Sequence, residues 1–331
     1  MEYRKFGNTD LLASEIGFGA WAIGGAAEVG GVQIGWGPSD DEVSKAAIHA
    51  ALEAGITFFD TADFYGLGHS ESLLGETIGS NPDVVIASKV GQKIGAGGSI
   101  EIDYSKAYIL KACEESLQRL KRDSIDFYHL HVARMHHLEQ GECIEAMELL
   151  REQGKIRYWG ASLITFAPEP EADFLMDAGK GHGFQLVLNL INQLSVPIMQ
   201  KASQKGYGII ARMPLQFGLL SGKIHPNSTF PSTDHRAKRL SPAIIQQTMD
   251  ILRTEMVPMA KQYNTNTAGL ALSFILGFKE VSTVIPGIRT VNQVKQNTEF
   301  LVKLSDHDHA FLCSLYEQKW KPVLELIRLQ G

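Results

Sequence analysis

Four polar side chains that together could donate a proton to a substrate lie near the ends of short apolar runs. Asp60, Lys89 and His131 each end such a run, and Tyr65 follows Asp60 by five residues. A tyrosine keeps its proton at neutral pH, because its usual pKa is about 10. A nearby lysine ammonium would lower that pKa, a carboxylate would keep the lysine charged, and a histidine could orient an oxygen or relay a proton. The set predicts a proton donor for the alkoxide that develops when a carbonyl carbon takes up a hydride.

Each of these residues alone also has a structural explanation. Asp60 could cap a turn, Lys89 could be a solvated strand end, and His131 could be a hydrogen-bonded core histidine. Their occurrence together at consecutive strand ends favours one shared site.

The elements that would position these residues alternate between short strands and amphipathic helices. Apolar runs rich in Val, Ile, Phe and Tyr predict buried parallel strands, which cover residues 15–19, 56–59, 84–87, 125–130, 156–160, 186–190, 208–211 and 281–285. Helical spacing of apolar residues predicts helices near 70–78, 106–120, 141–153, 197–205, 265–276 and 290–300. Ser39 and Glu42 predict a capping box for a further helix that ends at Gly55.

About eight strand-then-helix units without a linker predict an α/β fold, a (β/α)8 TIM barrel that forms a single domain over residues 1–331. A doubly wound open sheet is the alternative. In a barrel, reactive residues lie at the carboxyl ends of the strands. Two additions are expected: a long polar loop after strand seven, residues 216–239, and a helical extension from Ser305. A loop of that length is usually a functional lid or disordered.

Composition narrows the class of protein further. The chain has 331 residues, 44% apolar and 21% charged, with a net charge of −6, so it is globular and has no basic excess for nucleic acid. Three cysteines without a CxxC pair favour neither a disulfide framework nor a zinc site and fit a reduced, cytoplasmic location. No run approaches the roughly 18 apolar residues of a membrane span, and the N-terminus is unlike a signal peptide.

A glycine motif near the N-terminus matches the dinucleotide fingerprint G-x-G-x-x-A between Gly17 and Ala22. That fingerprint works only when a helix begins directly after the glycines. No helical pattern begins before Ser39, so a loop over the barrel mouth is the better interpretation.

Several segments together resemble the aldo-keto reductase family, and its longer bacterial-type members most of all. They occur in family order over nearly the whole chain: GITFFDTADFYGLGHSESLLGETIG, IASKVG, IDFYHLH, GKIRYWGAS, FQLVLNLINQ, GIIARMPLQFGLLSGK and VIPGIRTVNQVKQN. The resemblance implies reversible, NADPH-dependent reduction of aldehydes and ketones to alcohols. It implies Tyr65 as general acid and base, Asp60 and Lys89 as the residues that tune it, and His131 as the residue that orients the substrate.

The resemblance also implies which residues bind NADP(H). The set comprises Ala20 and Trp21, Ser162 and Gln185 at the nicotinamide carboxamide, Met213, Pro214, Leu215, Gly218, Ser221 and Lys223 along the pyrophosphate, and Gly287, Arg289, Gln293, Gln296 and Asn297 around the adenosine and 2′-phosphate. Arg212 stands where a stacking aromatic is common, and a planar guanidinium can also stack. Leu163 replaces a common asparagine. A predicted helix start at Thr290 suits an anion.

The predicted partner is a small-molecule carbonyl substrate, with no metal, no nucleic acid and no membrane, and the oligomeric state stays open. Trp21, Phe64 and Met135 are candidate wall residues, and strand alternation favours His131 over His129 as the rim-facing histidine. Two other functions are considered. One is a cofactor-sensing regulatory subunit with slow turnover; the other is a metal-dependent lyase or hydrolase, for which His136 and His137 lack zinc spacing.

Overall fold

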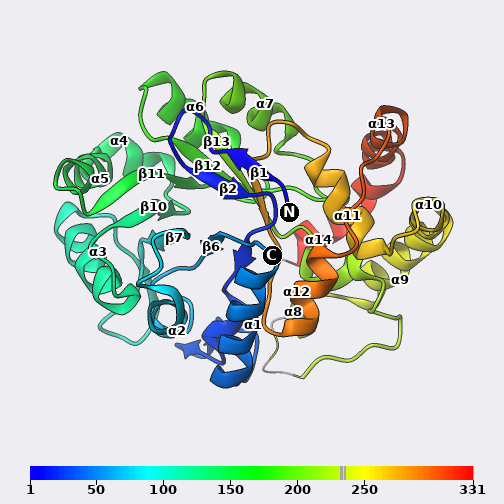
Figure 1. Ribbon diagram of the computed structural model, residues 1–331, viewed down its shortest axis with the longest axis horizontal. Helices are drawn as coiled ribbons and strands as arrows, with labels where there is room; N and C mark the ends of the chain where they lie inside the picture. Colours follow the sequence, from blue (N-terminus) through cyan, green and yellow to red (C-terminus); the bar gives the residue numbers. More distant parts are fainter. Residues whose placement is uncertain (232–233, 235, 331) are drawn as a thin grey trace.

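The computed structural model describes residues 1–231, 234 and 236–330 and is built around a ring of parallel strands (Figure 1). In ring order the strands are β3 (Phe18–Gly19), β6 (Phe58–Asp60), β7 (Val85–Val90), β10 (Ile125–His131), β11 (Ile156–Ser162), β12 (Gly183–Val187), β13 (Gly208–Arg212) and β14 (Thr283–Ile285). Each pairs in parallel with the next. Bridges from Ile16 to Val284 and from Gly19 to Gly287 join the first strand to the last. The predicted barrel is confirmed, and the open-sheet alternative is wrong.

Helices follow the strands, and most of them cover the outside of the ring (Figure 1). They are α1 (Asp41–Glu53), α2 (His69–Ile78), α3 (Lys106–Leu120), α4 (Met135–Gln140), α5 (Glu142–Glu152), α6 (Glu169–Asp177), α7 (Val196–Gln204), α8 (Arg236–Arg239), α9 (Pro242–Ile251), α10 (Val257–Gln262), α11 (Thr267–Leu276), α12 (Val291–Thr298), α13 (Asp306–Leu315) and α14 (Lys321–Leu329). The last two form the predicted C-terminal extension. No helix in the described part of the chain is long and apolar enough to cross a membrane.

Several predicted boundaries are wrong at the rim of the barrel. Three strands extend past the apolar run that predicted them and include Lys89, His131 and Arg212 as interior-facing polar ends. The strand predicted over 186–190 instead covers Gly183–Val187, because Asn189 ends it: its side-chain oxygen accepts backbone hydrogen bonds from Ile191 and Asn192, both at 2.9 Å. An Asx-turn of this kind competes with strand pairing.

The predicted cap of the first long helix is also one residue off. The side chain of Asp40, not that of Ser39, accepts the amide of Val43 at 2.9 Å and caps α1. The Ser39 hydroxyl instead donates to the carbonyl of Ile23 at 3.3 Å. Both residue types suit an N-cap, so the sequence alone does not separate them.

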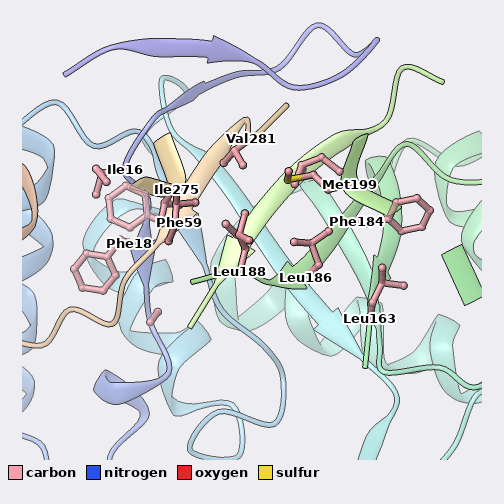
Figure 2. Packing of buried hydrophobic residues seen from close by; sticks show 14 of the residues in the cluster. Ile16, Phe18, Phe59, Leu163, Phe184, Leu186, Leu188, Met199, Ile275 and Val281 are labelled. Atoms are coloured by element: carbon pink, nitrogen blue, oxygen red, sulfur yellow. The ribbon is translucent and has the colours of Figure 1, made fainter. Parts of the chain in front are cut away.

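Two groups of buried apolar side chains hold the fold together. The larger lies between the strands and the outer helices, where Figure 2 shows Phe184 and Leu186 beside Met199. The smaller lies inside the barrel and includes Phe6, Phe58 and Phe127. This inner group fills the amino end of the strands and leaves the carboxyl end for polar side chains.

A hairpin of β1 (Tyr3–Lys5) and β2 (Leu12–Ser14) closes the amino end of the barrel and crosses it in Figure 1. Between its strands Phe6 is fully buried, with its ring centroid 4.9 Å from that of Phe127. Arg4 ties the hairpin to the end of α11 by donating to the carbonyl of Leu276 at 2.9 Å and to that of Val281 at 3.1 Å. Two further hairpins, β4–β5 (Glu28–Val29, Val32–Gln33) and β8–β9 (Gln92–Ile94, Ile100–Ile102), contribute residues to the cavity described below.

Candidate active site

The predicted proton-donor group is assembled around the ammonium of Lys89. This fully buried side chain donates to Asp60 Oδ1 at 2.6 Å, to the Thr61 carbonyl at 2.7 Å and to the Tyr65 hydroxyl at 3.2 Å. The other carboxylate oxygen of Asp60 accepts the side-chain amide of Gln185 at 2.6 Å. All three ammonium protons and both carboxylate oxygens therefore have partners, which a buried ion pair requires.

The loop after β6 brings Tyr65 to this ammonium. Gly66 has a φ of +60°, and a Cβ there would lie 2.1 Å from the carbonyl oxygen of Gly24. Only glycine fits so close an approach of two backbones. The contact sets Trp21 against Tyr65, with ring centroids 5.9 Å apart and an angle of 24° between planes.

A strained turn fixes His131 beside the phenol. The His131 ring lies edge-on to Tyr65, 6.0 Å between centroids. The next residue, Val132, has a φ of 66°, a costly conformation for a β-branched side chain. Two hydrogen bonds hold the turn: the Val132 amide donates to the Ser162 carbonyl at 3.1 Å, and the Tyr104 hydroxyl donates to the His131 carbonyl at 2.5 Å.

The expectation that strand alternation separates His131 from His129 is wrong. Residues two apart face the same side of a strand, and His129 packs inside the barrel with its ring 4.7 Å from that of Phe127. Depth separates the two histidines: His129 is fully buried, whereas His131 lines the cavity. Burial, with the charge of Lys89 acting in the same direction, lowers the pKa of both imidazoles well below the usual range, so both are neutral at pH 7.

Burial also governs the other ionisable groups of the site. It raises the pKa of Tyr65, and the opposing effect of Lys89 does not outweigh it. Lys89 does act on the pKa of Tyr65 in the expected downward direction, but burial, which the sequence analysis did not include, makes the net direction upward. Burial lowers the pKa of Lys89, but Asp60 and Tyr65 more than offset this, so its pKa is raised and the ammonium stays charged.

A cavity of about 1160 Å³ opens at the carboxyl end of the barrel and reaches the phenol of Tyr65. The predicted residues that line it are Asp60, Tyr65, His131, Trp21, Ser162, Gln185, Arg212, Met213, Pro214, Leu215, Gly218, Ser221, Lys223, Gly287, Arg289, Gln293, Gln296 and Asn297. Two predicted residues lie behind this wall. Lys89 is one, and Ala20 is the other, with its amide bonded to the Asp60 carbonyl at 2.8 Å. Phe64 lines the cavity and Met135 does not.

One end of the cavity suits a phosphate group. There α12 begins with a capping box, in which Gln293 Oε1 accepts the backbone amides of Arg289 at 2.8 Å and Thr290 at 3.1 Å. Lys223 reaches the same helix and donates to the side chain of Gln296. A helix N-terminus next to cations attracts anions. Gln293 contributes to this end of the cavity by capping the N-terminus of α12.

Asn189 positions the segment that joins the two ends of the cavity, a role that the sequence reasoning missed. Its side-chain amide donates to the Met213 carbonyl at 2.9 Å and to Gln216 Oε1 at 2.8 Å. Met213, Gln216 and Phe217 all have positive φ values, between 43° and 56°. Such strain persists only where the surroundings hold it. The available signal was an amide in the middle of the apolar run LVLNLI.

The predicted long loop carries some regular structure in its described part. It includes a short 3-10 segment, η2 (Gln216–Ser221), and α8; residues 232, 233 and 235 lie outside the described residues. The guanidinium of Arg236 lies 5.4 Å from the ring centroid of Trp36, a residue of the loop before α1. Both line the cavity, as do Phe166 and Ile327. Arg236 belongs to the predicted loop, whereas Trp36, Phe166 and Ile327 were not predicted, although an aromatic within a glycine-rich segment was a usable signal for Trp36.

No cluster of three or more His, Cys, Asp or Glu side chains that could hold a metal ion occurs within residues 1–231, 234 and 236–330. The metal-dependent alternative thus has no ligand set in the described part of the chain.

Comparison with known proteins identifies the family. The sequence profile described as "Aldo/keto reductase family" matches residues 15–317, and the chain belongs to this family. It is 29% identical over 316 residues to L-galactose dehydrogenase of Arabidopsis thaliana, covering 92% of this chain and 89% of that protein. A solved structure of a glycerol dehydrogenase from Gluconobacter oxydans matches with a TM-score of 0.80 at 27% identity, covering 96% and 95% of the two chains. An aldo-keto reductase of Klebsiella pneumoniae in complex with NADPH matches with a TM-score of 0.70 at 25% identity, covering 95% of each.

Proposed function

We propose that the protein catalyses the reversible, NADPH-dependent reduction of aldehydes and ketones to alcohols, with Tyr65 as general acid and base. The observation that carries the proposal is the hydrogen-bonded chain from Asp60 through Lys89 to the Tyr65 hydroxyl, at the wall of a large cavity. An oxidoreductase that uses NADP(H) is also what the family and its NADPH-bound neighbour support.

The residues of the cavity fit this cofactor. Arg289 lies just before the start of α12 and Lys223 reaches Gln296 of the same helix, and two cations near a helix N-terminus suit a 2′-phosphate. At the other end, the buried Nε of Arg212 has no hydrogen-bond partner among the described residues, and Ser162 and Gln185 supply polar groups for a carboxamide. NADPH, when bound, would supply the hydride that the carbonyl carbon accepts.

The chain's own residues would manage the proton. Tyr65 would donate its phenolic proton to the carbonyl oxygen, and Lys89 would stabilise the phenolate that remains, because its ammonium lies 3.2 Å from the hydroxyl. Asp60 would hold that ammonium charged and in place. His131, neutral at pH 7, would orient the carbonyl oxygen by a hydrogen bond. In alcohol oxidation the same phenolate would act as the base.

The substrate would lie against an apolar and aromatic wall. Trp21, Phe64, Phe166 and Ile327 are among the residues that line the cavity, and the guanidinium of Arg236 is already paired with Asp234 at 2.6 Å. Such a wall suits uncharged aldehydes and ketones, or a sugar face stacked on Trp21. We place the reaction in the cytoplasm, where free cysteines such as the three of this chain stay reduced.

The alternative, a regulatory subunit that senses the cofactor, needs no working proton donor. The complete and fully bonded group of Asp60, Lys89 and Tyr65 therefore favours an enzyme.

The test is NADPH consumption with a panel of aldehydes and ketones, for the wild type, Tyr65→Phe and Tyr158→Phe. Tyr65→Phe should lose about 10²–10⁴-fold in reduction rate, the usual contribution of a positioned acid, while NADPH binding is kept. Tyr158 packs at the closed end of the barrel, so Tyr158→Phe should reduce at the wild-type rate. Near-normal turnover by Tyr65→Phe would overturn the assignment, and NADPH binding without turnover in the wild type would favour the regulatory alternative.

A further inference from the structure

Arg212 brings a fixed positive charge to the reacting end of the cavity. It ends β13 and lines the cavity together with Asp60, Tyr65 and His131. One guanidinium nitrogen donates to the Leu163 carbonyl at 2.9 Å, another contacts the Met213 sulfur at 3.3 Å, and Nε is buried without a partner in the described residues. Both contacts are with uncharged atoms, so they position the guanidinium without neutralising it.

The other charges at this end cancel one another. Asp60 and Lys89 form an ion pair at 2.6 Å. His131 is neutral at pH 7. Within the described residues no carboxylate lies within ion-pair distance of Arg212, whereas the more peripheral Arg236 has one in Asp234. The reacting end of the cavity therefore carries a net charge of about +1, and this charge belongs to Arg212, whose guanidinium stays protonated at any physiological pH.

We propose that Arg212 makes this site discriminate between the two redox forms of its cofactor, so that it binds NADPH more tightly than NADP⁺. The inference rests on the proposed function. The two forms carry the same phosphates and differ by one positive charge, which the oxidised nicotinamide ring has and the reduced ring lacks. A carbonyl that takes its proton from Tyr65 must receive its hydride in the same small space, so the ring must share that space with Arg212.

The size of the effect follows from the charges. Two unit charges about 5–7 Å apart at an effective dielectric constant of about 20 repel each other enough to change an equilibrium constant by roughly fiftyfold to a few hundredfold. Removing the cation should relieve this repulsion for NADP⁺ and leave the affinity for NADPH much less affected. For the enzyme, the consequence is that spent cofactor leaves readily and NADPH replaces it.

The inference is tested by binding, without turnover. Dissociation constants for NADPH and NADP⁺ are measured by calorimetry for the wild type, Arg212→Gln, Arg212→Lys and Arg289→Gln. The wild type should bind NADPH at least about tenfold more tightly than NADP⁺. In Arg212→Gln the ratio of the two constants should fall about tenfold or more, and Arg212→Lys should keep most of it.

Arg289→Gln is the matched control, because it removes a cation at the phosphate end, where the two cofactors are identical. It should weaken both and leave their ratio unchanged. A wild-type ratio near one, or a ratio that survives in a folded Arg212→Gln, would overturn the inference while leaving the proposed function intact. Failure of the wild type to bind either form would overturn the proposed function itself. Because the wild-type ratio is a test on its own, the inference can be refuted even if Arg212→Gln does not fold.

Discussion

At the amino end of the barrel strands, Phe6, Phe58 and Phe127 fill the interior and a hairpin covers them. At the carboxyl end, the phenol of Tyr65 faces an open cavity, and a buried ion pair lies next to it. The amino end is held by apolar contacts, each of which stabilises the fold by removing area from water. The carboxyl end buries charges, which stabilise little and must be paired to be tolerated. The amino ends of the strands therefore contribute mainly to the stability of the fold, and the carboxyl ends carry the polar side chains of the candidate site.

Most of the side-chain-bearing residues with a positive φ in the described part of the chain lie near the open end. At the closed end, the positive φ of 53° falls on Gly7, where a Cβ would lie 2.4 Å from the Gly206 carbonyl oxygen. At the open end, Val132, Met213 and Phe217 take positive φ values although they carry side chains. Glycine adopts this conformation without strain, and other residues do not. Lys121, which caps α3 just before β10 begins, has a positive φ of 53° at the amino end, so this kind of strain is concentrated at the open end but not confined to it.

Lys89→Met should produce the largest effect. Although Lys89 lies at the carboxyl end of the strands, its loss should lower the stability of the fold as well as the activity. It leaves the Asp60 carboxylate buried without its counterion, which should lower the free energy of unfolding by about 3–5 kcal/mol and abolish most reduction. Urea unfolding measures the first effect and NADPH consumption the second. The double variant Asp60→Asn with Lys89→Met should regain most of the stability and none of the activity. Wild-type stability in the single variant would show that the pair is not buried as described.

Phe6→Ala should lower the stability of the fold and leave the catalytic rate unchanged. Truncating a fully buried phenylalanine should cost about 3 kcal/mol or more, and kcat per folded molecule should stay at the wild-type value. Leu12→Ala on the same hairpin is the control: Leu12 is 56% exposed, so its loss should change stability by no more than about 0.5 kcal/mol. A lower kcat in folded Phe6→Ala would mean that the two ends are coupled.

Arg289→Ala should show that, within the open end, the residues that recognise the cofactor are separate from those that transfer the proton. It should weaken NADPH binding by about 1.5–3 kcal/mol, the range for hydrogen bonds to charged groups, and change NADH binding little, because NADH lacks the 2′-phosphate. Titration with both cofactors checks this. Lys295→Ala, an exposed cation of α12 outside the cavity wall, should bind both as the wild type does. Equal losses for NADPH and NADH would make Arg289 structural.

The smallest effect should be that of pH on carbonyl reduction. Because burial raises the pKa of Tyr65, the phenol stays protonated through the neutral range, and reduction should fall only above a pH of about 10. His131, with its pKa lowered, should add no change between about pH 6.5 and 9. Alcohol oxidation, which needs the phenolate, should rise toward alkaline pH. A rate profile measured from pH 6 to 11 tests this, and an alkaline fall that persists in Tyr65→Phe would assign it to another group.

The sequence predicted the barrel and the grouping of Asp60, Lys89 and Tyr65 because both depend on local patterns. Apolar runs identify strands, and Asp60, Lys89 and His131 stand at their ends, so the topology brings them together. Local patterns could not predict the residues that reach the site through tertiary contacts. Ile327 and Trp36 reach the cavity only because distant segments fold over it, and Asn189 was hidden inside an apolar run that predicted a strand. The net direction of the Tyr65 pKa also depends on burial, which sequence spacing does not reveal.

Closure of the ring between Ile16 and Val284 has a consequence for the synthesis of the chain. Strand β3 leaves the ribosome early, but the second neighbour that covers its edge is made roughly 270 residues later. At about 5–20 residues per second this takes roughly 15 to 55 seconds. During that time the edge of β3 and the apolar ring of Phe6 have no completed barrel to close, and unpaired strand edges are the parts of a chain most prone to associate with others. The edge of β3 is therefore the strand edge of the ring that stays unpaired longest while the chain is made, although it is among the first parts to be made.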